Sequence, residues 1–237
     1  MKSRTAALVG ESGLRALADS SVIVFGTGGV GSWCVEALAR TGVGRITVVD
    51  PDLVDVSNIN RQLPALASTV GLPKVEVMAS RIADINPECA VQALRCRYTP
   101  DSADSFAIET YDYVVDAIDS MADKTDLILR CTDPATAPRR GFIASMGAAR
   151  KADAGAVRAA SFWKAEGCPL ARALRTRFRR AGLHPAFRCV YSPEPPMPQE
   201  PGPNGTFMHV TAAFGLRLAQ EILADILSGT DGAKMGE

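Results

Sequence analysis

The sequence has no excess of charge of either sign, few aromatic residues and almost no histidine. Its 237 residues include 26 Lys and Arg against 26 Asp and Glu, two His, and 6% aromatic residues. A zero net charge argues against a protein that coats nucleic acid by bulk electrostatics, but it does not exclude a local basic patch. The hydrophobic fraction of 47% excludes a disordered chain and predicts a globular protein with a large core.

Paired cysteines and long apolar runs are also missing. No two of the six cysteines form a Cys-x-x-Cys pair, which excludes the usual zinc-ribbon and thioredoxin-type sites. No window approaches the ~20 apolar residues of a membrane-spanning helix. Residues 1–10 also lack the apolar stretch of a signal peptide. We therefore expect a cytoplasmic protein that does not associate with membranes.

Apolar runs alternate with helical patterns, which predicts an α/β fold. Strands are expected over 21–26, 45–50, 89–97, 111–119 and 138–145, and helices over 30–40, 74–85 and 123–132. This order predicts a doubly wound, Rossmann-like, mostly parallel sheet with helices on both faces. A helix over 3–18 precedes it. A strand over 156–162, a helix over 169–181, a proline-rich loop over 192–206 and a helix over 207–228 extend it.

A glycine-rich turn joins the first predicted strand to the helix that follows. The run Gly-Thr-Gly-Gly-Val-Gly contains Gly26, Gly28, Gly29 and Gly31. Such a turn lets a phosphate approach the backbone N–H groups at a helix N-terminus. Asp50 ends the next strand, where an acid can accept hydrogen bonds from ribose hydroxyls. These residues predict nucleotide binding.

The residues after Asp50 suit a triphosphate better than a dinucleotide. The polar side chains that follow are Asp52, Ser57, Asn58, Asn60, Arg61, Gln62 and Lys74. A lysine in the first turn of a helix opposes the helix dipole, so its position indicates an anion nearby. Arg61 and Lys74 can clamp a triphosphate and stabilise the charge of departing pyrophosphate. Asp119 ends a later strand and can hold Mg²⁺.

Taken together, these motifs resemble the adenylating domain of the ubiquitin-activating-enzyme-like family, which includes the ThiF, MoeB and HesA proteins. The resemblance covers about residues 4–147 and rests on G-x-G-G-x-G, D-x-D, S-N-x-N-R-Q, G-x-P-K, I-N-P and D-A-I-D. It implies an enzyme that uses ATP and Mg²⁺ to form an acyl-adenylate. It also implies that the glycines and Asp50 line the nucleotide and that Asp119, followed by Ser120, handles the metal. The residues that it places at the phosphates are Ser57, Asn58, Asn60, Arg61 and Lys74.

The N-terminal segment adds a second implication of the resemblance. Arg4 is similar to the family's N-terminal arginine, which reaches across a homodimer into the ATP site of the partner. The resemblance therefore implies a homodimer in which Arg4 joins Arg61, Lys74 and Asp119 as catalytic residues. We expect a single adenylation domain over 1–237. Its parts are an N-terminal helix (1–19), a nucleotide-binding core (20–147) and a substrate and dimer portion (148–230), and the tail at 230–237 is expected to be unstructured.

Further segments resemble one branch of this family, the tRNA threonylcarbamoyladenosine dehydratases. They are 29–33, 36–42, 75–79, 116–120, 145–148, 168–171 and 190–196. In this branch the threonyl carboxylate of the modified nucleoside is adenylated. The carbamoyl group then closes a ring and expels AMP, so no protein nucleophile is needed. Cys168 is the one thiol weighed as an acyl acceptor, and its flanking residues favour a structural role.

A run of arginines without any acid follows Cys168. Arg172, Arg175 and Arg179 share one face of the predicted helix, and Arg180 extends the charge. This run predicts a surface for tRNA phosphates, with an ordinary solvated helix face as the alternative.

Three other functions explain part of the pattern. An adenylyltransferase that activates the C-terminal glycine of a ubiquitin-like sulfur carrier would share every ATP residue, but it would need an apolar docking groove for that carrier. The sequence leaves open whether a sulfur-transfer partner regulates the enzyme. A nicotinamide-dependent oxidoreductase would explain the glycines and Asp50 but leaves Arg61, Lys74 and Asp119 without a shared role. A nucleotide-binding scaffold without chemistry is disfavoured because Arg61 and Asp119 are both present.

Overall fold

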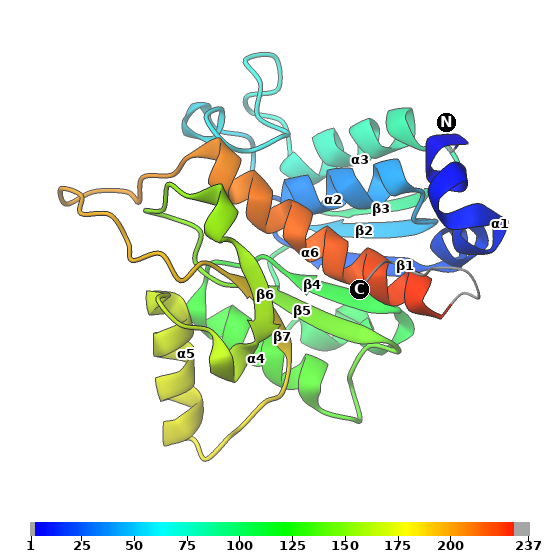
Figure 1. The fold of residues 1–237 in the computed structure, drawn as a ribbon. Coiled ribbons are helices and arrows are strands. Elements are labelled where there is room, and N and C mark those ends of the chain that lie inside the picture. Colours follow the sequence, from blue (N-terminus) through cyan, green and yellow to red (C-terminus); the bar gives the residue numbers. More distant parts are fainter. Residues whose placement is uncertain (1–2, 230–237) are drawn as a thin grey trace.

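The computed structural model describes residues 3–229 and shows a seven-stranded sheet in the order β3-β2-β1-β4-β5-β7-β6 (Figure 1). The strands are β1 (Ser21–Phe25), β2 (Arg45–Val49), β3 (Ala90–Leu94), β4 (Tyr113–Asp116), β5 (Gly141–Ser145), β6 (Arg158–Ser161) and β7 (Arg188–Tyr191). Every neighbouring pair is parallel except β6 and β7. The predicted doubly wound, mostly parallel sheet is therefore confirmed. The tail at 230–237 lies outside the described residues.

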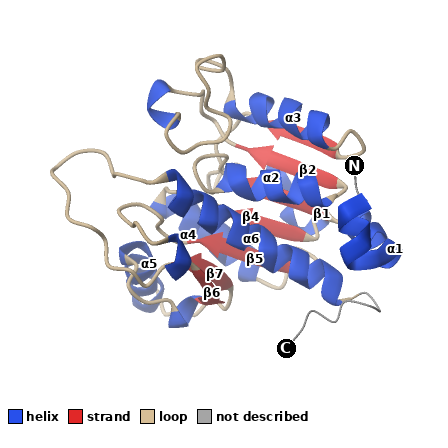
Figure 2. Cartoon of the chain, turned by 45° about the horizontal axis from the view of Figure 1, so that its top comes forward, coloured by secondary structure: helices blue, strands red, loops and turns tan. Residues whose placement is uncertain are grey.

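Helices cover both faces of the sheet, as expected (Figure 2). They are α1 (Ser3–Asp19), α2 (Gly31–Thr41), α3 (Lys74–Ile85), α4 (Met121–Thr132), α5 (Pro169–Arg180) and α6 (Met208–Ser228). α1, α2, α3 and α6 lie on one face, and α4 and α5 on the other. No helix in the part of the chain that the structure describes is long and apolar enough to cross a membrane.

The central strand β1 shows why the sheet is so apolar. All five of its residues are buried. Val22 and Val24 pack into the core under α2 and α6, whereas Ile23 and Phe25 pack into the second core, under α4 and α5. A parallel strand that is buried on both faces reads as a continuous apolar run, and this run allowed its prediction from the sequence.

Several elements differ from their predicted bounds. β4 ends at Asp116 rather than at 119, because Oδ1 of Asp116 accepts a hydrogen bond from Ile118 N (2.9 Å) and turns the chain out of the sheet. β7 was not predicted, since Arg188 interrupts its short apolar run. In the structure Arg188 forms ion pairs with Glu221 and Asp225 of α6. The predicted N-terminal helix is present, with non-helical torsions at Gly10 (φ 67°, ψ −178°).

The proline-rich segment 192–206 has no helix or strand, as predicted. Two of its residues bond to the backbone of Arg150: Arg150 N donates to Gly205 O (2.9 Å), and Met197 N donates to Arg150 O (2.7 Å). The buried Lys151 side chain donates to the carbonyl oxygens of Ser192 and Glu194. These bonds hold the base of the loop beside the carboxyl edge of the sheet, from which the loop extends (Figure 1).

Candidate active site

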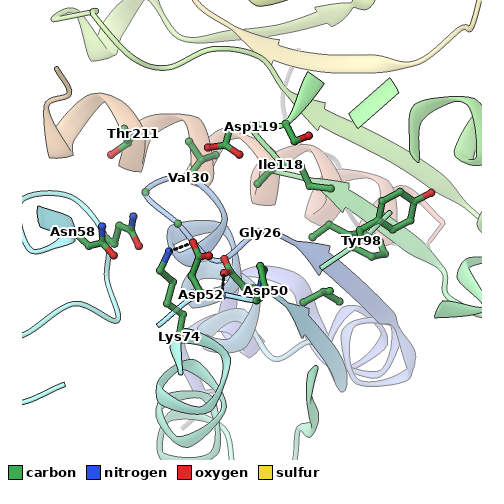
Figure 3. Close-up of a pocket in the computed structure, with 18 of the residues that line it drawn as sticks. Gly26, Val30, Asp50, Asp52, Asn58, Lys74, Tyr98, Ile118, Asp119 and Thr211 are labelled. Carbon is green, nitrogen blue, oxygen red and sulfur yellow. Dashed lines mark hydrogen bonds and ion pairs between the residues drawn. The ribbon is translucent and has the colours of Figure 1, made fainter. Parts of the chain in front are cut away.

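A pocket of about 460 Å³ opens at the carboxyl ends of β1, β2 and β4. β1 lies between β2 and β4, so the chain's crossovers change direction there. Open α/β sheets bind ligands at such a switch point. Of the predicted nucleotide-binding residues, the pocket is lined by Gly26, Gly28, Gly29, Asp50, Asp52, Asn58, Arg61, Gln62, Lys74, Asp119 and Ser120. Figure 3 shows how several of these side chains surround the opening.

The glycine-rich turn is sterically closed to larger residues. Gly26 has φ 92°, and a Cβ there would lie 2.7 Å from Ala117 O; a Cβ on Gly31 would lie 1.8 Å from Gly26 O. Gly31 is buried at the start of α2 and does not line the pocket, so its role is to let the turn pack tightly. At Gly28, by contrast, a Cβ would make only ordinary contacts. The backbone at that position is open to a ligand.

The Asp50 carboxylate organises this turn. Its Oδ2 accepts hydrogen bonds from Thr27 N (2.7 Å) and Thr27 Oγ1 (3.1 Å), and its Oδ1 accepts one from Asp52 N (3.0 Å). The sequence motif predicts that Asp50 meets a ribose. In the structure Asp50 also links the glycine-rich turn to the segment after β2, a contribution that has no signal in the sequence.

Lys74 lies at the start of α3 with its ammonium group against Asp52. Lys74 Nζ is 2.8 Å from Asp52 Oδ2, and Lys74 N donates to Asp52 O (3.0 Å). The Lys74 side chain is 6% exposed, whereas that of Asp52 is 61% exposed. The position of Lys74 at a helix start indicated an anion nearby, and within the protein that anion is the Asp52 carboxylate at the pocket rim (Figure 3). This partner fixes the lysine beside the space that a phosphate would enter.

Arg61 is held by neighbours that were expected to touch the nucleotide themselves. Its Nη1 donates to Ser57 O (3.0 Å) and to Asn60 Oδ1 (2.9 Å), and Asn60 Nδ2 donates to Thr206 O (3.2 Å). Neither Ser57 nor Asn60 lines the pocket. Both residues therefore contribute by orienting the guanidinium group.

Asn58 and Gln62 flank Arg61 inside the pocket. Asn58 Oδ1 accepts a hydrogen bond from Asp55 N (3.1 Å) and so caps the short turn that precedes Arg61. Hydrogen bonds from the side chain and the backbone N–H of Ser57 lower the pKa of Asp55. Gln62 is buried, and its Oε1 has no hydrogen-bond partner among the described residues. That oxygen is available to accept a bond from a ligand.

Asp119 is, like Asp52, an exposed carboxylate of the pocket. It makes no hydrogen bond or salt bridge with any residue in the described range 3–229. The pKa of Arg97 is raised mainly by its hydrogen bond to Asp123, and the charge of Asp119 adds to this effect. The described residues contain no cluster of three or more His, Cys, Asp or Glu side chains that could enclose a metal ion. An oxygen-lined pocket with one free carboxylate suits Mg²⁺, which is commonly bound through one or two carboxylates together with phosphates.

The end of the pocket away from Arg61 is apolar and was not predicted. Phe25, Val49, Cys96, Tyr98 and Ile118 line it, and the Phe25 and Tyr98 rings meet edge to face at 5.1 Å. Across its rim, Arg97 donates to Asp123 Oδ2 through Nε (3.0 Å) and Nη2 (2.8 Å). Phe25 and Val49 end β1 and β2, and Ile118 lies in the loop after β4. Cys96, Arg97 and Tyr98 follow β3, where the sequence has no motif. An apolar end next to a cationic end fits a nucleotide base joined to phosphates.

Arg4 lies far from this pocket within the chain. It is exposed near the start of α1, which ends directly before β1 begins, at the amino edge of the sheet (Figure 1). The pocket is at the carboxyl edge. Arg4 cannot reach the pocket of its own chain.

The arginines of α5 divide into two groups. Arg175 Nη1 donates to Ala165 O (2.5 Å), and its guanidinium group lies 5.8 Å from the centre of the Phe162 ring. Arg175 therefore faces the protein, contrary to its predicted place on an open basic face. Arg172, Arg179 and Arg180 are exposed. These three keep their charge at the surface, although the Arg179 guanidinium group also lies 5.6 Å from the centre of the Trp163 ring.

The cysteines show no arrangement for covalent catalysis. Cys168 is 1% exposed at the N-cap of α5, next to Gly147, which fits the structural role favoured from the sequence. Burial raises the pKa of Cys189 to about 12 and also raises the pKa of Cys34 and Cys131. Cys96 is exposed in the pocket, and partial burial raises its pKa too.

Comparisons with known proteins agree with this geometry. The chain is 45% identical over 197 residues to a Bacillus subtilis protein named tRNA threonylcarbamoyladenosine dehydratase, which covers 82% of this chain and 75% of that protein. The structure of E. coli tRNA N6-threonylcarbamoyladenosine dehydratase, TcdA, in complex with ATP matches with a TM-score of 0.88 at 38% identity, over 99% of this chain and 96% of that chain.

A more distant relative has the name of the alternative function. The adenylyltransferase and sulfurtransferase MOCS3 of Anopheles gambiae is 30% identical over 231 residues, which are 96% of this chain but 46% of that protein. The sequence profile of the ThiF family, which the motifs had indicated, matches residues 2–235. A match over almost the whole chain, together with a pocket that gathers the family's motif residues, leaves one assignment: the chain belongs to the ThiF family.

Proposed function

We propose that this chain is an ATP-dependent enzyme that dehydrates threonylcarbamoyladenosine in tRNA. The observation that carries the proposal is the 38% identity, over nearly the full length of both chains, to an ATP-bound dehydratase of this kind. The pocket supports it with a glycine turn, two cationic side chains and a free carboxylate. A sulfur-carrier adenylyltransferase is less well supported, because the relative of that name is less similar and about twice as long.

The residues suggest how ATP is held. The phosphates lie against the N–H groups of the Gly28–Gly29 turn at the start of α2, where the helix dipole favours negative charge. Arg61 and Lys74 approach from the segment after β2. Asp50 and Asp52 meet the ribose, and the base enters the apolar end between Phe25 and Ile118.

The first chemical step is attack of the threonyl carboxylate on the α-phosphorus of ATP. The new O–P bond forms as the bond to the β-phosphate oxygen breaks, and pyrophosphate leaves. Negative charge grows on the leaving group, and Arg61 and Lys74 offset it because both are positioned before the reaction by Ser57, Asn60 and Asp52. Asp119 is the residue that would hold Mg²⁺, which supplies charge neutralisation at the phosphates when bound.

The second step closes the ring. The carbamoyl group of the same nucleoside attacks the acyl carbon, the bond to AMP breaks, and the attacking group loses its proton. Nucleophile and electrophile belong to one molecule, so the protein only has to hold them in line. No thiol is required, in agreement with the burial of Cys168. The net change is loss of one water from the nucleoside.

Two partners belong to the proposal. We assign tRNA phosphates to the exposed Arg172, Arg179 and Arg180, which lie on the helix beside the carboxyl edge of the sheet. We also propose a homodimer, because Arg4 is exposed at the opposite edge from its own pocket. Large apolar side chains are exposed on the segment beside the pocket, which favours a covered surface. They are Leu53, Val56, Ile59, Leu66, Val70 and Leu72.

The test is mass spectrometry of nucleosides from tRNA that carries threonylcarbamoyladenosine, incubated with the protein, ATP and Mg²⁺. We expect a product lighter by one water, formed only with ATP, and one AMP released per product. The variant D119A serves as the control that should bind tRNA without forming product. If ATP–pyrophosphate exchange appears only when a ubiquitin-like carrier is added, and the nucleoside is unchanged, the carrier adenylyltransferase replaces this proposal.

A further inference from the structure

An ion pair lies buried beneath the loop that carries Asp119. Asp116 is the last residue of β4, and Lys124 lies in the first turn of α4. Asp116 Oδ2 is 2.7 Å from Lys124 Nζ, and both side chains are 0% exposed. Removal of two charges from water is costly, and mutual attraction rarely returns a net gain, so such a pair is weak evidence for stability. Its position in the fold gives a better explanation.

The pair fixes the loop 117–120 at both ends. Asp116 Oδ1 accepts a hydrogen bond from Ile118 N (2.9 Å), and Lys124 N donates to Ser120 O (2.9 Å). The ion pair joins these two anchoring residues across the base of the loop. Beyond it, Asp123 is tied to Arg97 on the other rim of the pocket. The backbone between β4 and α4 thus has few ways to move.

This backbone is also packed against the glycine-rich turn. Ala117 N donates to Phe25 O (2.8 Å), and the lack of a side chain on Gly26 leaves room for Ala117 O. Ala117, Ile118, Asp119 and Ser120 all line the pocket. Asp119 has no hydrogen bond of its own to any described residue, so no side-chain partner holds its carboxylate and the path of the backbone sets the region that it can reach.

We propose that the Asp116–Lys124 pair is a positioning device that holds the loop 117–120 so that Asp119 and Ser120 face the nucleotide. Neither residue touches the pocket. The inference rests on the proposed function only in taking ATP as the ligand. Removal of such a support from behind a ligand-binding group typically costs ~10-fold or more in affinity or activity.

Two double variants separate positioning from bulk stability. D116L/K124M removes both charges and the acceptor for Ile118 N, with side chains of similar size, so the cost of a buried unpaired charge is avoided. D116N/K124M removes both charges but keeps an amide oxygen for Ile118 N. R130M is the matched control, because Arg130 forms ion pairs with Asp104 and Asp126 from the same helix, α4, away from the loop.

The measurements are hydrogen exchange of the peptide that spans 117–123, the dissociation constant for ATP, and the melting temperature. We expect exchange and the ATP dissociation constant to rise by ~10-fold in D116L/K124M, by less in D116N/K124M, and not at all in R130M. The ranking of the three variants by exchange and by ATP dissociation constant should differ from their ranking by melting temperature. These readouts need no tRNA, so a wild-type protein that fails to dehydrate the nucleoside would overturn the proposed function alone.

Wild-type exchange and ATP affinity in a folded D116L/K124M would overturn the inference. If that variant does not fold, D116N/K124M decides the question. Values equal to those of the wild type would then show that the ion pair does not position the loop.

Discussion

Arg61 is the residue whose charge the proposed chemistry needs most, and it contributes little to the fold. Among residues 3–229, its guanidinium group bonds only to Ser57 O and Asn60 Oδ1, both on its own loop. We expect Arg61→Ala to lower kcat for AMP release by ~10²–10³-fold, the range for loss of one group that stabilises developing charge. Arg61→Lys should recover only part of the activity, because a single ammonium nitrogen cannot make both loop bonds and also present a planar set of donors to phosphate. Release of AMP with threonylcarbamoyladenosine-containing tRNA measures the effect.

The melting temperature of both Arg61 variants should stay at the wild-type value. Arg158→Ala is the matched control, since Arg158 is exposed on β6, outside the pocket, and its Nε donates to Ala156 O two residues away. Full activity in Arg61→Ala would mean that the leaving pyrophosphate is stabilised elsewhere.

The site could be predicted from the sequence where residues act through short, fixed spacing. The glycine turn, Asp50, Lys74 and Asp119 stand close after strands or at helix starts, and the carboxyl edge of a parallel sheet brings such positions together. Arg61 lies in the loop between β2 and α3 and is identified by its S-N-x-N-R-Q motif. Residues from distant segments gave no such signal. Thr211 of α6 and Thr206, just before that helix, reach the pocket because α6 crosses the sheet. The inward turn of Arg175 depends on the carbonyl of Ala165.

At the scale of elements, the arginines of α5 allow tRNA binding and protein stability to be tested separately. We expect R172A/R179A/R180A to weaken tRNA binding and to reduce the slope of log affinity against log salt by about three, roughly one for each phosphate that is no longer bound. Binding titrations with tRNA over a range of NaCl concentrations measure the slope. Arg175→Ala should leave the slope unchanged and lower the free energy of unfolding by about 1–3 kcal/mol, because two carbonyl acceptors lose a charged donor. An unchanged slope in the triple variant would place tRNA on another surface.

α2 and α3 are joined through one buried carboxylate, which predicts a pH-dependent stability. Burial alone would raise the pKa of Glu36, but hydrogen bonds and charge from Arg81 and Arg40 outweigh it and lower the pKa. A lowered pKa gives stability that is present above the unfolded value of about 4.3 and is lost as the pH falls through the folded value. We expect Glu36→Gln to lower the free energy of unfolding at pH 7 by about 1–3 kcal/mol.

Urea unfolding of the wild type and Glu36→Gln at several pH values tests this linkage. The difference between them should stay constant from pH 7 to 6 and shrink below about pH 4.3. A difference that is equally large at pH 3 would assign the effect to packing of Glu36 rather than to its charge.

The elements of the core were predictable because each buried strand or helix has its own apolar period. α3 starts and ends at the predicted residues, and α2 and α6 differ from prediction by one residue at one or both ends. The larger errors are the end of the central strand β4, where Asp116 turns the chain, and the missed strand β7. β7 is short and is held by ion pairs of Arg188 with α6, and a contact between segments so far apart in sequence leaves no local pattern.

At the scale of the whole molecule, the position of Arg4 predicts that two chains complete one site. A dimer of R4A chains lacks Arg4 in both sites, and a dimer of R61A chains lacks Arg61 in both. A mixed dimer has one site with neither residue and one site with both. Random exchange of subunits in an equal mixture makes about half of the dimers mixed, so about a quarter of the wild-type sites are restored.

The measurement is AMP release from R4A and R61A proteins, assayed separately and after co-incubation long enough for exchange. We expect each alone to be nearly inactive and the mixture to reach about a quarter of wild-type activity. A mixture of R61A with D119A is the control, because those two residues line the same pocket and each mixed dimer then has one damaged residue in each site. α1 and the pocket lie at opposite edges of the sheet. If activity recovers in the mixture of R4A with R61A but not in the control mixture, Arg4 must therefore enter the site of the partner chain. Equal activity in both mixtures would show that Arg4 does not complete the partner's site.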